Sequence, residues 1–62
     1  MTGVEMIKML KRKGFKVLKL SKGSHYHMIK DSAYVIVPHH HTELGKGLYN
    51  RILEDARLKG EV

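Results

Sequence analysis

The 62-residue chain contains no cysteine, a single proline, and no apolar run long enough to cross a membrane. Without cysteine the fold has no disulfide, and thiolate metal sites and cysteine nucleophiles are excluded. A spanning helix needs about 20 apolar residues, and the first 13 residues lack the continuous apolar core of a signal peptide. We therefore expect one soluble, cytoplasmic domain over residues 1–62. Its stability should be modest, because a domain this small buries only about 60% of the surface of its unfolded chain.

Acidic residues are scarce in the first half of the chain, and the net charge of +6 is unevenly distributed. Residues 1–30 contain eight lysines or arginines and one glutamate, whereas residues 31–62 contain four basic and five acidic residues. A positive field of this kind attracts polyanions, of which RNA and DNA are the commonest. The same composition also suits a solvated lysine face that keeps a small protein soluble. Charge alone does not separate these two interpretations.

Two segments have the periodicity of amphipathic helices. Apolar residues at three- and four-residue spacing predict a helix over about residues 3–13. Thr2 begins a T-x-x-E capping box, and Gly14 stands where a left-handed C-cap would end the helix. A second apolar stripe, at four-residue spacing, predicts a helix over about residues 45–58 that ends by Gly60.

Three strand-like segments lie between these helices, over residues 15–20, 25–30 and 33–37, and Pro38 should end the last. Their short connections imply an antiparallel meander. The order α-β-β-β-α lets two helices cover one face of a three-stranded sheet and leaves the other face open. We therefore predict an α+β fold like that of double-stranded-RNA-binding domains, although a fold alone does not confer their activity.

Histidine is the residue type in this chain that is best suited to metal binding or acid–base chemistry. There are five, namely His25, His27, His39, His40 and His41. His25 and His27 share one face of the predicted strand, because side chains alternate along a strand. This geometry could hold a metal, but zinc needs more ligands and no carboxylate or cysteine lies nearby in sequence. We expect no metal and no other cofactor.

The more specific alternative for His25 is acid–base catalysis of RNA cleavage. Imidazole, with an ordinary pKa of about 6.5, exchanges protons near neutral pH, and RNA supplies its own nucleophile, the 2′-hydroxyl. Lys22 could offset charge that develops on the phosphate. A histidine such as His25, considered without its sequence context, more often has a structural role than a catalytic one. Tyr26 and Tyr34 could stack on bases, although aromatic residues in a small sheet more often belong to the core.

Three stretches, taken together, carry a family resemblance. They are Gly14-Phe15, Lys22-Gly23-Ser24-His25, and Val37-Pro38 followed by His40, Glu43-Leu44, Lys46-Gly47 and Ile52-Leu53. G-S-H alone is short and common, but V-P-x-H-x-x-E-L about a dozen residues later makes the pattern much more specific. From about Val4 to Leu58, the sequence resembles the HicA family of toxin mRNA interferases, described also as YcfA-like.

The resemblance implies a ribosome-independent RNase that cleaves mRNA and is neutralised by a HicB-type antitoxin. It also implies that His25 is the active-site histidine. His40 matches the V-P-x-H element, and its role could be RNA binding, shaping of the site or proton transfer. Ser24 is expected mainly to fix the turn, and His27, which matches no motif position, to be a same-face neighbour of His25. The residues expected to bind RNA are Lys8, Lys11, Arg12 and Lys22.

Two departures from the family pattern stand out. Arg57 occupies a position where many relatives have glycine, and we expect it to extend the second helix by part of a turn. His39 and His41 flank His40, which leaves open which histidine faces the substrate. Two rival functions remain at this point, a non-catalytic RNA-binding module of the same fold and a histidine-rich metal-binding protein.

Overall fold

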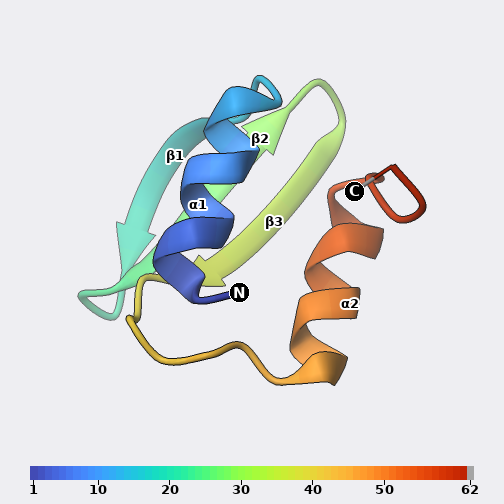
Figure 1. Cartoon of the computed structure of the whole chain (residues 1–62). Helices are drawn as coiled ribbons and strands as arrows, with labels where there is room; N and C mark the ends of the chain where they lie inside the picture. Colours follow the sequence, from blue (N-terminus) through green and yellow to red (C-terminus); the bar gives the residue numbers. More distant parts are fainter. Residues whose placement is uncertain (62) are drawn as a thin grey trace.

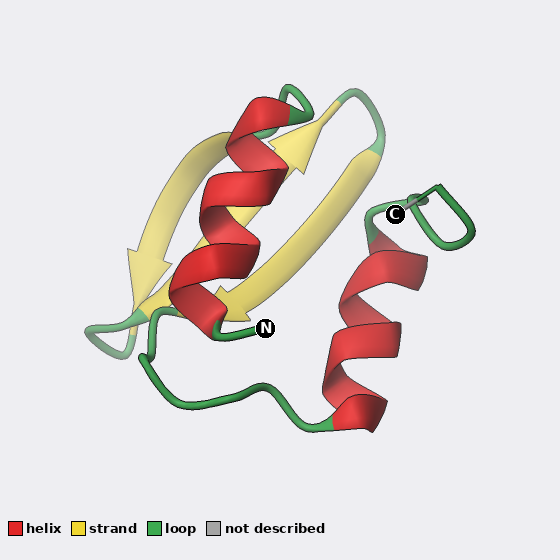
Figure 2. Cartoon of the chain, in the orientation of Figure 1, coloured by secondary structure: helices red, strands yellow, loops and turns green. Residues whose placement is uncertain are grey.

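The structure, a computed structural model, describes residues 1–61 and contains two helices and three strands (Figure 1). In chain order they are α1 (Gly3–Arg12), β1 (Lys16–Ser21), β2 (His25–Lys30), β3 (Ala33–Pro38) and α2 (Lys46–Asp55). The strands form one antiparallel sheet in the order β1-β2-β3. Helix α1 crosses one face of this sheet, and α2 runs beside β3 after a long loop (Figure 2). The predicted α+β, double-stranded-RNA-binding-like architecture is confirmed.

The hydrophobic core lies between the helices and one face of the sheet. Its largest fully buried side chains are Met6, Leu10, Met28, Ile52, Val35 and Val37, which come from α1, β2, α2 and β3. In β3 the buried residues alternate with exposed ones, as expected for a strand that has one packed face. We call the other face, on which His27, Tyr34 and Ile36 lie, the outer face. Among the described residues, α1 does not cover it (Figure 1).

The start of α1 is fixed by two sets of contacts. Thr2 and Glu5 form the predicted capping box, in which the Glu5 amide donates to the Thr2 hydroxyl at 3.1 Å and the Thr2 amide donates to the Glu5 carboxylate at 2.8 Å. Gly3 lies so close to the chain after β3 that a Cβ there would clash with the carbonyl oxygen of Pro38. The Val4 amide also donates to the His40 carbonyl at 3.2 Å. The segment after β3 is therefore held against the first turn of α1.

The predicted end of the second helix is wrong. Helix α2 ends at Asp55 with Ala56 as its C-cap, not near Leu58, and Gly60 is not its terminator. Arg57 adopts a left-handed conformation with φ of 61°, so it ends the helical path instead of extending it. The reversal returns Leu58 to the core, and its amide donates to the Leu53 carbonyl at 2.8 Å.

Strand β1 begins one residue later than predicted and contains a bulge. Phe15 precedes the strand and is buried in the core. The register shifts between Val17 and Lys19, so that Val17 pairs with Met28 on the core face. Beyond the shift Lys19 pairs with His27, and strict alternation is broken. Lys19 and the residue two positions later, Ser21, are thereby placed on the outer face.

Candidate active site

The G-S-H motif lies where the chain turns from β1 into β2. Ser21 and His25 pair across the end of the hairpin, and three residues connect them. Lys22 and Gly23 both have positive φ, at 49° and 77°. Glycine adopts this conformation at little cost, which explains its place in the motif. The turn sets His25 as the first residue of β2.

His25 is half-buried, and its two ring nitrogens differ in environment. Within residues 1–61, its Nδ1 atom is buried and has no hydrogen-bond partner. A proton held on Nδ1 would lack an acceptor in an environment that water does not reach, which is costly. Proton exchange at Nε2 keeps a proton on Nδ1 throughout, so in that role the Nδ1–H group stays without a hydrogen-bond acceptor among residues 1–61.

His40 and Ser24 lie beside His25. The ring centroids of His25 and His40 are 6.4 Å apart with an interplanar angle of 73°. The Ser24 hydroxyl lies 3.3 Å from Nε2 of His40, and the Ser24 carbonyl accepts a 2.7 Å hydrogen bond from the His39 amide. Ser24 thus connects the β1–β2 turn to the segment after β3.

The two histidines that flank His40 have different neighbours. His39 stacks on Tyr26, with ring centroids 4.9 Å apart and an interplanar angle of 17°. The ring of His41 lies edge-on to that of His39, with ring centroids 6.2 Å apart, and His41 is exposed. Of these three consecutive histidines, His40 is the one whose ring pairs with that of His25.

The basic residues expected to bind RNA are exposed. Within residues 1–61, none of the side chains of Lys8, Lys11, Arg12 and Lys22 forms a hydrogen bond or an ion pair. Lys22 is three residues from His25, in the turn that places it. Lys8 and Arg12 instead line an open hollow along α1, which His25 does not border. Lys22 is therefore close to His25 along the chain, whereas Lys8, Lys11 and Arg12 belong to α1.

A second histidine site, which the motif did not indicate, spans all three strands. His27 lies between the Ser21 hydroxyl, 2.7 Å from its Nε2, and the Tyr34 hydroxyl, 2.7 Å from its Nδ1. We call Ser21, His27 and Tyr34 the outer-face cluster. Period-two alternation indicates that His27 and His25 share a face. The bulge in β1, which the sequence does not signal, is what brings Ser21 to that face.

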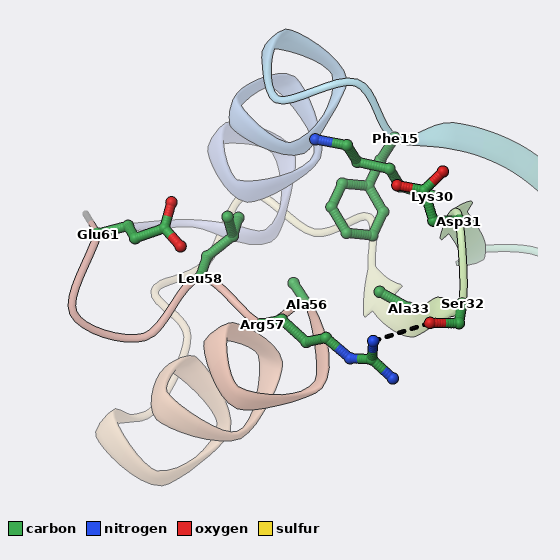
Figure 3. A pocket seen from close by; sticks show the side chains of 9 residues that line it. All are labelled: Phe15, Lys30, Asp31, Ser32, Ala33, Ala56, Arg57, Leu58 and Glu61. Atoms are coloured by element: carbon green, nitrogen blue, oxygen red, sulfur yellow. Dashed lines mark hydrogen bonds between the residues drawn. The ribbon is translucent and has the colours of Figure 1, made fainter.

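A pocket of about 210 Å³ lies at the other end of the hairpin, around the β2–β3 turn and the end of α2 (Figure 3). Phe15, Ala33 and Leu58 are among its lining residues, and Arg57 donates a 2.8 Å hydrogen bond to the Ser32 hydroxyl at its rim. Neither His25 nor His40 lines it. This pocket is therefore separate from the G-S-H region.

The described residues hold neither a metal-ligating cluster nor a candidate membrane span. No group of three or more histidine, cysteine, aspartate or glutamate side chains is arranged to hold a metal ion within residues 1–61. Over the same range, neither helix has both the length and the apolar character that a membrane span requires.

Comparison with known proteins supports the resemblance seen in the motifs. A family model described as the HicA toxin of bacterial toxin–antitoxin systems matches residues 3–58, nearly the whole chain. No curated protein and no solved structure gives a significant match. The chain therefore belongs to the HicA family, whose members are nuclease-type toxins that act with an antitoxin partner.

Proposed function

We propose that this toxin is a metal-independent endoribonuclease that cleaves mRNA, with His25 as its general acid or base. The observation that carries the proposal is the position of His25 in a chain of this family. It begins β2 directly after the G-S turn and lies beside His40, and its Nε2, unlike Nδ1, is not a buried unpartnered atom. Lys22 precedes it in a turn held by two left-handed residues.

The reaction needs no group that RNA and the protein do not supply. The 2′-oxygen of the ribose attacks the adjacent phosphorus, the bond from phosphorus to the 5′-oxygen breaks, and a 2′,3′-cyclic phosphate forms. His25 takes the proton of the 2′-hydroxyl, or donates one to the leaving 5′-oxygen, while His40 or water serves the other oxygen. Lys22 offsets the charge that develops on the phosphate. Lys8, Lys11 and Arg12 bind phosphates farther along the RNA.

Cleavage of RNA in the presence of EDTA tests this function. We expect the wild type to cut a single-stranded RNA, and His25→Ala to lose about 100-fold or more of the rate, the usual contribution of a general acid or base. His41→Ala is the matched control, because His41 is exposed and its ring lies edge-on to that of His39. Intact RNA with the wild type, or equal cutting by His25→Ala, would contradict the proposal.

The partner that fits this toxin is a HicB-type antitoxin, and the cytoplasm is where both would meet mRNA. In the N-terminal half of the chain, residues 1–30 carry eight basic residues and one acidic residue. An antitoxin with an acidic surface would bind this half quickly and selectively. By covering His25 it would also exclude RNA from the site.

One observation favours a second candidate, a non-catalytic RNA-binding module. The proton-transferring histidine of a catalytic triad is oriented by an acceptor at its other ring nitrogen. Within residues 1–61 no such acceptor reaches Nδ1 of His25. This candidate predicts that the protein retains RNA and leaves it intact, so the cleavage assay separates the two.

A further inference from the structure

The outer face of the sheet has the charge of a surface that binds a polyanion. None of the three strands contains an aspartate or a glutamate. Lys16 pairs with Ile29, and Lys19 pairs with His27, so both lysines lie on the outer face at β1. Both are exposed. The face therefore combines positive charge at one edge with a complete absence of acidic strand residues.

The outer-face cluster connects this surface to the proposed active site. Ser21, one end of the cluster, is the cross-strand partner of His25. From Ser21 the hydrogen bonds run through His27 to Tyr34 on β3, and thus cross all three strands. An RNA whose scissile phosphate lies at His25 could therefore continue across the outer face along this cluster.

Tyr34 provides an aromatic surface at the far end of the cluster. Tyr34 is 41% exposed although its hydroxyl is hydrogen-bonded to His27, and neighbouring Ile36 is 46% exposed. Both line a hollow of about 250 Å³ between β3 and α2, together with Leu48, Arg51, Ile52 and Asp55. An exposed ring whose hydroxyl is anchored is suited to stacking on an unpaired base.

We propose that the outer face binds single-stranded RNA that leads to His25, with a base stacked on Tyr34 and phosphates bound by Lys16 and Lys19. This inference rests on the proposed function in taking RNA as the ligand. Stacking on a side chain requires an unpaired base, so the surface selects single strands over duplexes. The occupant we infer is RNA and not a protein partner, because the face combines exposed lysines for phosphates with an exposed ring for a base, beside a hydrogen-bonded polar cluster.

Binding of a single-stranded 2′-O-methyl RNA, measured by fluorescence anisotropy, tests the inference. This probe lacks the free 2′-hydroxyl and cannot be cut by the proposed reaction, so binding is scored apart from cleavage. We expect Tyr34→Ala to weaken binding about tenfold or more, and Tyr34→Phe, which keeps the ring, to change it less than about twofold. A duplex of the same sequence should bind more weakly than the single strand.

RNA binding by a lysine variant provides a second, independent test. Lys19→Ala should weaken binding and reduce the slope of log affinity against log salt by about one. Lys59→Ala is the matched control, because Lys59 lies outside the sheet and is already paired with Glu54 at 3.2 Å. Its effect should be smaller than that of Lys19→Ala. These exposed positions also test the surface if Tyr34→Ala folds poorly.

Several results would overturn the inference. They are wild-type affinity in both Tyr34→Ala and Lys19→Ala, equal losses in Tyr34→Phe and Tyr34→Ala, or a duplex that binds as tightly as the single strand. A loss of antitoxin binding alone, with RNA binding unchanged, would also overturn it and assign the face to the protein partner. A wild type that binds the probe as expected but does not cut natural RNA contradicts the proposed function and leaves this inference standing.

Discussion

At the scale of single residues, two helical glycines have opposite surroundings. A Cβ on Gly3 would clash with the backbone of Pro38, whereas a Cβ on Gly47 would meet nothing within 4 Å. We expect Gly3→Ala to lower the free energy of unfolding by about 2 kcal/mol, because backbone cannot move aside as a flexible side chain can. Gly47→Ala should raise it by about 0.5–1 kcal/mol through helix propensity. Urea denaturation of both variants measures the difference, and equal effects would contradict the close approach at Gly3.

Arg57 adopts a left-handed backbone conformation with a φ of 61°. This conformation costs about 1–2 kcal/mol for a residue with a Cβ. Arg57→Gly removes that cost, whereas Arg57→Ala keeps it, and both lose the hydrogen bond to Ser32. We expect the glycine variant to have a free energy of unfolding about 1 kcal/mol above that of the alanine variant. A more stable alanine variant would show that α2 continues through Arg57.

Residue patterns predicted the position of His25 but not the hydrogen bonding of the histidines. The G-S-H motif placed it at the start of a strand, where the structure has it. The contacts of His27 depend on the bulge in β1, which moves Ser21 to the outer face. A bulge here has no local signature, because Val17, Leu18 and Lys19 fit a regular strand equally well.

At the scale of elements, the capping box makes the stability of α1 depend on pH. The hydrogen bond from the Thr2 amide holds the pKa of Glu5 below its ordinary value. A lowered pKa in the folded state means that this contribution to stability is present at neutral pH and is lost as pH falls through the acidic range below about 4. Glu5→Gln should therefore destabilise the protein at pH 7, and the difference from wild type should shrink as pH falls.

Thermal unfolding of the wild type and of Glu5→Gln tests this prediction, measured from about pH 2.5 to about pH 7, a range that brackets carboxyl titration. Glu61→Gln is the control, because Glu61 lies outside α1 and no hydrogen bond or ion pair involves its carboxylate within residues 1–61. A difference between Glu5→Gln and wild type that persists at pH 2.5 would show that charge at Glu5 does not stabilise α1.

The sequence predicted all five elements, and it failed where tertiary packing overrides local periodicity. The apolar spacing of α2 continues through Ala56 to Leu58, so periodicity alone extends the helix that far. In the structure Leu58 reaches the core by a left-handed turn at Arg57, and the helix ends at Asp55. Such a reversal depends on the position of the core, which a pattern along one segment does not contain.

At the scale of the whole molecule, the sheet separates a packed face from an open one. The buried residues of both helices and β3 fill one side, and the outer-face cluster lies on the other. Positive charge is present on α1, in the β1–β2 turn and along β1, so basic residues are spread over several parts of the molecule. The arrangement suits an enzyme whose substrate is a long polyanion.

The measurement that tests the central claim most directly is cleavage, in EDTA, of an end-labelled RNA and of the same RNA with 2′-deoxyribose at the cut position. The account predicts that the wild type cuts the first to leave a 2′,3′-cyclic phosphate, does not cut the second at that position, and cuts neither at a comparable rate once His25 is replaced by alanine. Cutting of the deoxy-substituted position, or full activity without His25, would contradict it.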